Sequence, residues 1–208
     1  GTGVTATNIT YNGVVANAQI IQSNASFFDA SGNTFPFIDG VLLSTGAGTV
    51  AIGPNTSASE SNPAGTVNIV DADLAAISAS NIMNGIVLEF DFIAIGDTLN
   101  FDYIFASEEY PEFAPPQGSV NDVFGFFLSG PGIAGPYTNG AENIAVLPGT
   151  TTAISINNIN PATNPTFYVD NVGGAAYGNA IEYDGSTVPL TASASLTCGA
   201  EYHIKLAI

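Results

Sequence analysis

Acidic residues gather most tightly in one stretch near the middle of the chain. Glu108, Glu109 and Glu112 lie within five residues, and Asn121 and Asp122 follow shortly after. Neighbouring carboxylates repel one another, and a hard cation relieves that repulsion: Ca²⁺ takes about six to eight oxygen ligands from carboxylates, amides and carbonyls. We therefore predict a calcium site formed by Glu108, Glu109, Asn121 and Asp122. Alternatively, the glutamates accept backbone N–H bonds and shape the loop.

A second acidic pair, Asp71 and Asp73, precedes an alanine-rich stretch. The pair could hold calcium together with a carboxylate from another loop, such as Asp122 or Glu109. Alternatively, each charge stabilises the N-terminus of a short helix by about 0.3–1 kcal/mol. The pair lacks the Asp/Asn-Gly and the distal Glu of an EF-hand loop, so that motif is excluded. Mg²⁺ is less favoured than Ca²⁺ because it demands a stricter octahedron.

Catalytic chemistry has few candidate residues. His203 is the only histidine, and it lies in an alternating segment where a polar-face or hydrogen-bonded role is the simpler expectation. Zn²⁺ is disfavoured because Cys198 and His203 are the only thiolate or nitrogen ligands. Glu108 and Asp122 would be the pair to cleave a glycoside, but the sequence has no Trp to stack a sugar. We expect a protein that is not an enzyme.

Two other side chains occur once each in the sequence. Lys205 is the sole Lys or Arg. It could form an isopeptide bond with an Asn side chain, activated by a neighbouring carboxylate, or it could simply lie on a polar strand face. Cys198 is the only cysteine, so no disulfide forms within these residues. We expect a half-buried strand thiol, with pairing to a cysteine elsewhere as the alternative.

The composition excludes several classes of protein. The 208 residues carry a formal net charge of −17, which excludes binding to nucleic acid or anionic membranes through phosphate contacts. Hydrophobic residues make up 46% of the chain, too many for an acidic disordered segment. With only 9% charged residues, the surface must consist mainly of Ser, Thr, Asn and Gly. Such a surface suits an extracellular protein, and no apolar run is long enough to span a membrane.

The elements that position these residues are predominantly strands. Residues 87–93 and 99–105 each alternate apolar and polar side chains, and Gly96-Asp97 between them favours a turn, so the two runs predict a hairpin. Residues 123–128 form an apolar run typical of a buried strand. One segment, Asp71–Ile77, predicts a short helix.

Further short runs punctuated by Gly and Pro predict an all-β fold, an antiparallel two-sheet sandwich that is jelly-roll-like, with one short helix. We expect one domain over 1–208 that lacks its natural first and last segments. The final run, Tyr202–Ile208, looks like a strand with an uncovered edge. Either a following segment of the same chain or a strand of a neighbouring chain would cover it, and the second case would allow self-assembly.

The segments Phe105–Phe113 (FASEEYPEF) and Asn121–Gly132 (NDVFGFFLSGPG) are specific enough to suggest a family. They resemble the choice-of-anchor L domain of bacterial surface and secreted proteins, and Gly40–Gly46, Leu88–Phe92 and Cys198–Ile208 extend the similarity. The resemblance implies an exported or cell-envelope protein, and it does not imply an enzyme.

Two functions remain open. In the first, the chain is a structural or adhesive module of a cell-surface or secreted assembly, stabilised by calcium, whose partners are other surface protein chains. In the second, it is a calcium-dependent carbohydrate-binding module that contacts glycans through loop aromatics. The aromatic candidates in loop contexts are Tyr110, Phe113, Tyr137 and Tyr177. We expect no nucleic-acid partner and no direct membrane insertion.

Overall fold

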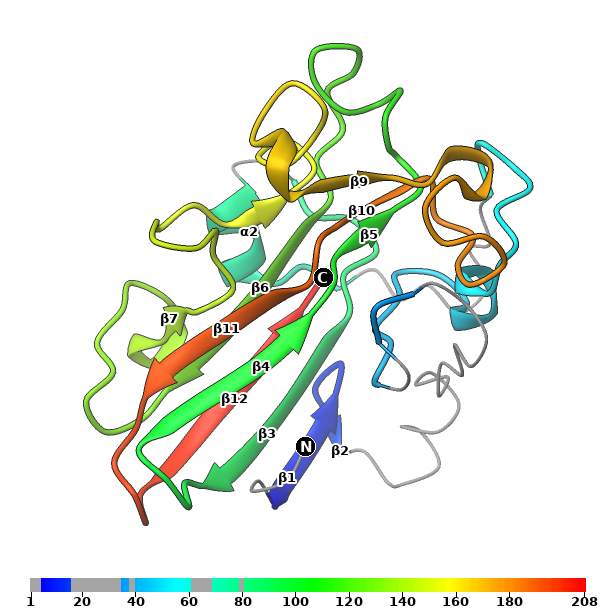
Figure 1. The fold of residues 1–208 in the computed structure, drawn as a ribbon. Coiled ribbons are helices and arrows are strands. Elements are labelled where there is room, and N and C mark those ends of the chain that lie inside the picture. Colours follow the sequence, from blue (N-terminus) through cyan, green and yellow to red (C-terminus); the bar gives the residue numbers. More distant parts are fainter. Residues whose placement is uncertain (1–4, 16–34, 38–39, 61–68, 79–80) are drawn as a thin grey trace.

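The computed structural model describes residues 5–15, 35–37, 40–60, 69–78 and 81–208. Within them, the largest sheet is antiparallel, with strand order β2-β1-β3-β12-β6-β7 and β8 also pairing with β6. Its strands are β1 (Ala6–Tyr11), β2 (Val14–Val15), β3 (Val87–Ile93), β6 (Val123–Ser129), β7 (Glu142–Asn143), β8 (Ile154–Ser155) and β12 (Glu201–Ala207). This sheet is the back layer of the molecule in the view of Figure 1.

The second layer consists of two short antiparallel ladders that the chain joins end to end. Strand β4 (Thr98–Tyr103) pairs with β11 (Leu190–Ser195), and β10 (Gly185–Thr187) pairs with both β5 (Ala106–Ser107) and β9 (Tyr168–Asp170). Between the ladders, Thr187 N donates to Phe105 O at 2.8 Å, and Figure 1 shows β4 leading into β5 beside β10 and β11. The predicted antiparallel β fold is confirmed, with a second layer that bends rather than forming one regular sheet.

Aromatic and aliphatic side chains from both layers form the main core. Alternation along each strand directs Phe92, Phe126 and Ile204 from the first layer toward Leu99 and Tyr103 of the second. The rings of Phe124 and Phe126 lie 4.7 Å apart, and each lies 5.4 Å from the ring of Tyr103. Burying one such side chain contributes about 1.5–3 kcal/mol, so this interface holds the two layers together.

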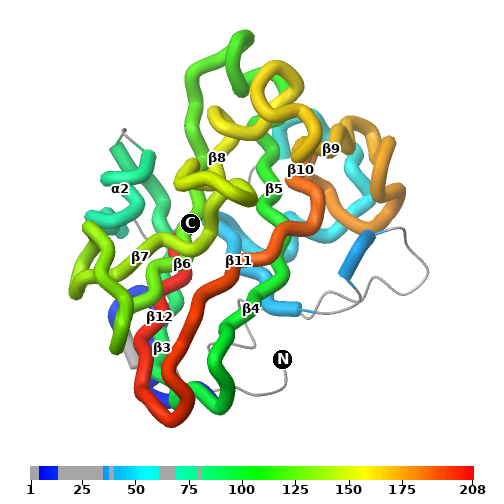
Figure 2. Tube along the Cα trace, turned by 60° about the vertical axis from the view of Figure 1, so that its left-hand side comes forward, coloured from blue at the N-terminus to red at the C-terminus, as the bar shows by residue number. Residues whose placement is uncertain are grey.

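Helix α2 (Ala72–Ser78) covers the opposite face of the large sheet. Its Leu74 packs with Val87, Val123 and Phe127, whose side chains point away from the main core. Figure 2 shows the resulting order of layers, with α2 on one side of β6 and β12 and with β11 and β4 on the other. The predicted helix over Asp71–Ile77 is confirmed, with a shift of one residue.

Short 3₁₀ turns complete the loops: η1 (Gly48–Ala51), η2 (Thr138–Gly140), η3 (Pro165–Phe167) and η4 (Val172–Gly174). Among the described residues, none forms a helix with the length and hydrophobicity to cross a membrane.

The predicted hairpin is wrong. Strand β3 pairs with β1 and β12, whereas β4 pairs with β11, so the turn at Gly96-Asp97 carries the chain from one layer to the other. Alternation shows which face of a strand is buried, but it does not name the partner strand. Here the two apolar faces meet across the core instead of lying side by side.

The prediction of an uncovered edge at Tyr202–Ile208 is also wrong. Strand β12 is central and pairs with β3 on one side and β6 on the other. It therefore offers no free edge for pairing with another chain. The isolated Lys205 on one face of β12 suggested solvent exposure, but its side chain is only 10% exposed and contacts Asp71 and Asp73 at the start of α2.

Three smaller differences concern the remaining segments. Strand β1 was not predicted, and residues 40–43, an apolar run that the sequence favours as a short strand, are irregular. Cys198 is exposed in the turn between β11 and β12, so the expectation of a half-buried strand thiol is wrong.

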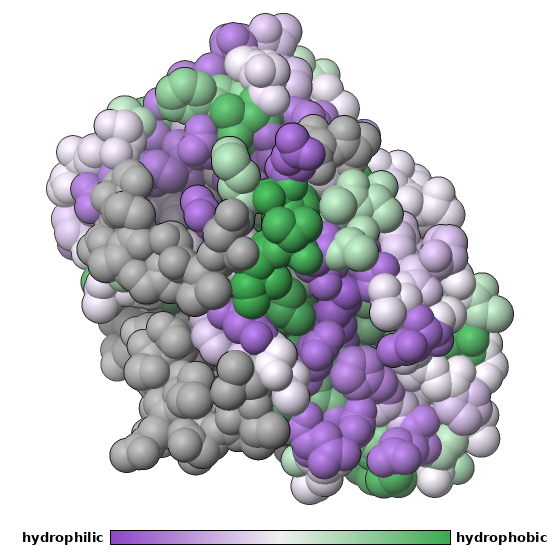
Figure 3. Space-filling view, turned by 180° about the vertical axis from the view of Figure 1, so that it is seen from behind, coloured by the Kyte–Doolittle hydropathy of each residue, from purple (hydrophilic) through white to green (hydrophobic). Residues whose placement is uncertain are grey.

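Figure 3 shows the back of the molecule, where a band of hydrophobic residues borders a broad hydrophilic surface.

Candidate functional site

Two groups of buried carboxylates lie in different parts of the structure. The first, which we call the acidic end, comprises Glu108, Glu182 and Asp184. The pairing of Ser107 with Gly185 in the β5–β10 ladder brings Glu108 beside Asp184. Glu182 is two residues from Asp184, the spacing that places side chains on one face of an extended segment.

The acidic end holds the loop 55–60 through hydrogen bonds. Glu108 Oε1 accepts the backbone N–H of Glu60 at 2.9 Å, and the Glu182 carboxylate accepts those of Thr56 and Ser57 at 3.2 Å. Asp184 Oδ1 accepts a bond from Asn55 Nδ2 at 2.7 Å. The alternative role for the glutamates, accepting backbone N–H bonds, is thus observed for Glu108, although the N–H belongs to a distant loop.

One oxygen of Glu108 and one of Asp184 lack a partner. Glu108 Oε2 and Asp184 Oδ2 are both buried and make no hydrogen bond within the described residues. Asp184 is only 1% exposed. Because a buried polar atom without a partner is costly, each of these two oxygens needs a proton, a bound cation or an ordered water molecule.

The pKa values of two carboxylates at the acidic end are raised. The pKa of Glu108 is raised to about 7, first by burial and then by the negative charges of Asp184 and Glu182, while the backbone N–H groups of Glu60 and Asp184 act to lower it. Burial likewise raises the pKa of Asp184, and Glu112 and Glu182 add to that effect. A nearby cation would favour the charged form of each carboxylate instead.

The other predicted ligands of the signature loop have structural partners. Asp122 Oδ2 accepts a bond from Ser107 Oγ at 2.6 Å, and Ser107 Oγ accepts the backbone N–H of Glu109 at 3.0 Å. Burial raises the pKa of both Glu109 and Asp122. Asn121 joins two segments, donating to Ser78 O and accepting from Asn157 N, both at 3.2 Å. The structure therefore brings Glu109 and Asp122 close together, while Asn121 fastens the end of α2.

Within the described residues, no three His, Cys, Asp or Glu side chains are grouped closely enough to hold a metal ion as they stand. Asn55, Glu182 and Asp184 were not predicted from the sequence as site residues. The Glu-Tyr-Asp-Gly spacing at 182–185 was the available signal, because alternation places both carboxylates on one face.

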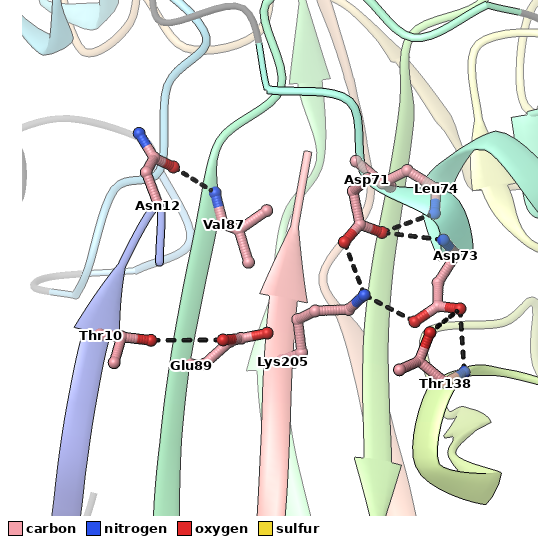
Figure 4. Close-up of polar contacts among 9 residues, drawn as sticks. All are labelled: Thr10, Asn12, Asp71, Asp73, Leu74, Val87, Glu89, Thr138 and Lys205. Atoms are coloured by element: carbon pink, nitrogen blue, oxygen red, sulfur yellow. Dashed lines mark hydrogen bonds and ion pairs between the residues drawn. The ribbon is translucent and has the colours of Figure 1, made fainter. Parts of the chain in front are cut away.

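The second group, which we call the lysine cluster, comprises Lys205, Asp71 and Asp73. Lys205 Nζ lies 2.7 Å from Asp71 Oδ2 and 2.6 Å from Asp73 Oδ2. Figure 4 shows the ammonium between the two carboxylates. The side chains are 10%, 13% and 6% exposed in the order Lys205, Asp71, Asp73, so the lysine does not lie on a solvated face.

The second oxygens of both aspartates are also used. Asp71 Oδ1 caps α2 by accepting the N–H groups of Asp73 and Leu74 at 3.0 and 2.9 Å. Asp73 Oδ1 accepts the N–H and the hydroxyl of Thr138 at 3.0 and 2.9 Å. Burial raises the pKa of Asp73, but the bonds from Lys205 and Thr138 outweigh it and lower the pKa overall. This pair serves as a helix cap and as the counter-ions of Lys205.

The one histidine lies on the outer face of the large sheet. His203 Nδ1 lies 2.7 Å from Asp91 Oδ1, and Asn8 Nδ2 donates to Asp91 Oδ2 at 2.7 Å. His203 is also opposite Ser129 across the β12–β6 ladder. Within the described part of the chain no hydrogen bond joins His203 to Ser129, and the side-chain partner of His203 is Asp91.

Comparison with known proteins gives a family and no individual relative. The model of one protein family, the Choice-of-anchor L domain, matches residues 1–208. No curated protein and no solved structure matches the chain. Because the family match extends over the whole sequence, this chain belongs to the choice-of-anchor L domain family, a module of surface-anchored proteins.

Proposed function

We propose that this domain is a non-enzymatic structural or adhesive module of a bacterial cell-surface or secreted assembly, and that calcium stabilises its acidic end. The observation that carries the calcium proposal is the pair of buried oxygens without partners, Glu108 Oε2 and Asp184 Oδ2. Two carboxylates and the carbonyls and waters of an adjoining loop are the kinds of ligand that Ca²⁺ accepts.

The charge of the chain supports a cation at this end. With 18 acidic residues and one Lys, the domain has no other side chain to neutralise Glu108 and Asp184, because Lys205 is occupied by Asp71 and Asp73. Binding calcium would also fix the loop 55–60, whose backbone N–H groups already bond to Glu108 and Glu182. In this proposal the cation holds the far end of the second layer in one arrangement.

The burial of the loop aromatics favours the structural or adhesive role over glycan binding. Tyr110 is fully buried and donates its hydroxyl to Ile159 O at 2.6 Å. Tyr177 is also buried, and Tyr137 packs against Phe127 with the rings 5.0 Å apart. Of the four candidates, Phe113 is the exposed one, at 46%. A glycan array with calcium should therefore show no binding, and binding that disappears with chelator would favour the lectin-like alternative.

Thermal unfolding with and without calcium tests the proposal. Saturating calcium at about 100 times its Kd should stabilise the domain by about 2.7 kcal/mol, which raises the Tm by about 5–10 °C for a chain of this size. Sodium at equal ionic strength should give no such rise. Asp184→Asn and Glu108→Gln should lose the response, whereas Glu142→Gln, which removes an exposed carboxylate, should keep it. An unchanged Tm in the native protein would overturn the calcium proposal.

A further inference from the structure

Lys205 meets the geometric requirements for a covalent reaction with a neighbouring side chain. Its Nζ is in contact with two carboxylates, at 2.7 Å from Asp71 and 2.6 Å from Asp73. Lys205 lies between two paired strands, opposite Glu89 in β3 and Phe127 in β6, and this fixes the position of its backbone. Reacting groups held in contact in this way need no diffusional encounter.

Apolar side chains surround the lysine cluster and limit its contact with water. The Phe127 ring centroid lies 4.8 Å from Nζ, and Leu74, Val87 and Val123 belong to the same apolar cluster as Phe127. Two carboxylates and one ammonium leave a net negative charge in this buried place, and burying such ions carries a large desolvation penalty. Replacing one carboxylate and the ammonium by a neutral amide removes two of the three buried charges, and Asp71 keeps the bonds from the N–H groups of Asp73 and Leu74.

Asp73 is the carboxylate best prepared to be attacked. The N–H and the hydroxyl of Thr138 both donate to its Oδ1, which leaves Oδ2 facing Nζ. Two donors on one carboxyl oxygen stabilise the negative charge that grows there when an amine adds to the carbon. Asp71 contacts the same nitrogen with its Oδ2 and can carry protons between Nζ and Asp73.

We propose that Lys205 and Asp73 form an intramolecular isopeptide bond, with Asp71 transferring the protons. One proton of the ammonium passes through Asp71 to Asp73 Oδ2, which leaves a neutral amine and a carboxylic acid. The amine lone pair then forms the N–C bond at Asp73 Cγ, and the electron pair displaced onto Oδ1 is held by Thr138. A second proton passes from the nitrogen to Oδ2, the C–Oδ2 bond breaks, and one water molecule leaves. The reaction requires no oxidant or other co-reactant.

The bond would join α2 to the central strand β12 across 132 residues of sequence. A cross-link over so long a segment restricts the unfolded chain in the way a long-range disulfide does. The single Cys198 cannot supply such a link within these residues. The sequence-based expectation named an Asn partner, and the structure instead places Asp73 and Asp71 against the amine. This inference is independent of calcium at the acidic end.

Trypsin gives a direct test because Lys205 is the sole Lys or Arg among these 208 residues. An acylated lysine is not cleaved. After full denaturation, the cross-linked native chain should resist cleavage after Lys205, and its intact mass should be lower than the sequence mass by one water. The Lys205→Arg variant keeps a basic side chain and a cleavage site, so after denaturation it should be cut and should show the full mass.

Two further comparisons make the result specific. A succinimide at Asp184-Gly185 would also lose one water, but it would persist in Lys205→Arg and would leave Lys205 cleavable. Asp73→Asn should still react with loss of ammonia, whereas Asp71→Asn should slow the formation of the bond. Fragment spectra joining the peptides of Asp73 and Lys205 complete the assignment. If the denatured native chain is cut fully after Lys205 and has its sequence mass, the cluster is an ordinary ion pair and the proposal is wrong.

Discussion

The lysine cluster and the acidic end contain the same kind of side chain under opposite conditions. In the lysine cluster the ammonium and the Thr138 donors lower the pKa of Asp73 despite its burial. At the acidic end burial and neighbouring charges raise the pKa of Glu108 and Asp184. With one Lys for 18 acidic residues, only one buried carboxylate group can have a side-chain counter-ion. The comparison shows that the supply of cations, rather than burial alone, decides whether a buried carboxylate stabilises this fold.

The largest effect is expected when the lysine cluster loses its cation. Lys205→Met leaves Asp71 and Asp73 buried without a counter-ion, which should lower the free energy of unfolding by about 3–5 kcal/mol relative to a native chain that holds the ion pair. Relative to a cross-linked native chain the loss should be larger, because the variant also lacks the restriction that the bond places on the unfolded chain. Urea unfolding at neutral pH measures the change. Adding Asp73→Asn to Lys205→Met should recover part of the loss, because it removes one of the unpaired charges. A loss below about 1 kcal/mol would mean that the cluster behaves like a surface pair.

At the acidic end, in the presence of chelator, we expect a substitution to raise the free energy of unfolding instead of lowering it. Asp184→Asn keeps an oxygen to accept the bond from Asn55 and places an N–H donor where the unpartnered oxygen lies. It also removes a charge that raises the pKa of Glu108. We expect the variant to be more stable than the native chain by about 1 kcal/mol in chelator. Destabilisation there by a similar amount would show that Asp184 already has a partner, and would contradict the comparison.

The pH dependence of stability distinguishes the two groups again. The pKa of Glu108 is about 7 in the folded chain and 4.5 in its ordinary state, so between these values the folded state binds more protons than the unfolded state. The free energy of unfolding should therefore fall as pH rises from about 4.5 to 7 in chelator, and then level off. Urea midpoints at several pH values measure this. Glu108→Gln should make the slope smaller, and Glu109, Asp122 and Asp184, whose pKa values are also raised, should keep the remainder. The pKa of Asp73 is lowered in the folded chain, so protonation of Asp73 reduces the stability only under acid conditions, as the pH falls.

The sequence predicted the features that depend on neighbouring residues, but not the contacts between segments that lie far apart in the chain. Local signals were sufficient for α2, where Asp71 caps the helix, and alternation correctly assigned the buried faces of β3 and β4. Partners across the fold were not predictable. The pairing of β12 with β6 joins residues at least 74 positions apart, as at His203 and Ser129. The pairing of β12 with β3 and the contact of Lys205 with Asp73 join residues more than a hundred positions apart, and no local pattern encodes any of these contacts.

The candidate site shows the same limit. Clustering along the chain pointed to Glu108 and Asp122, but Glu182 and Asp184 reach Glu108 only because β10 pairs with β5. The sequence placed Asp71 and Asp73 beside a helix, whether they held calcium or stabilised the helix N-terminus. It could not show that the single lysine would lie against them. The sequence thus showed which acidic residues cluster along the chain. Which partner each carboxylate has could be known only from the fold.

The smallest effect is expected at the pair of His203 and Asp91, which serves as a reference for both buried groups. Their side chains are 38% and 25% exposed, so water screens the interaction, and such pairs typically contribute about 0.2–1 kcal/mol. Bonds from Asn8 and His203 lower the pKa of Asp91, and Asn8 remains after His203 is replaced. His203→Gln should therefore lower the free energy of unfolding by about 0.5 kcal/mol, with a smaller loss in high salt because part of the interaction is ionic. Urea unfolding at low and high salt measures both values. A loss as large as that of Lys205→Met would show that solvent exposure does not weaken this pair. In that case the exposed pair of His203 and Asp91 would contribute as much to stability as the buried lysine cluster.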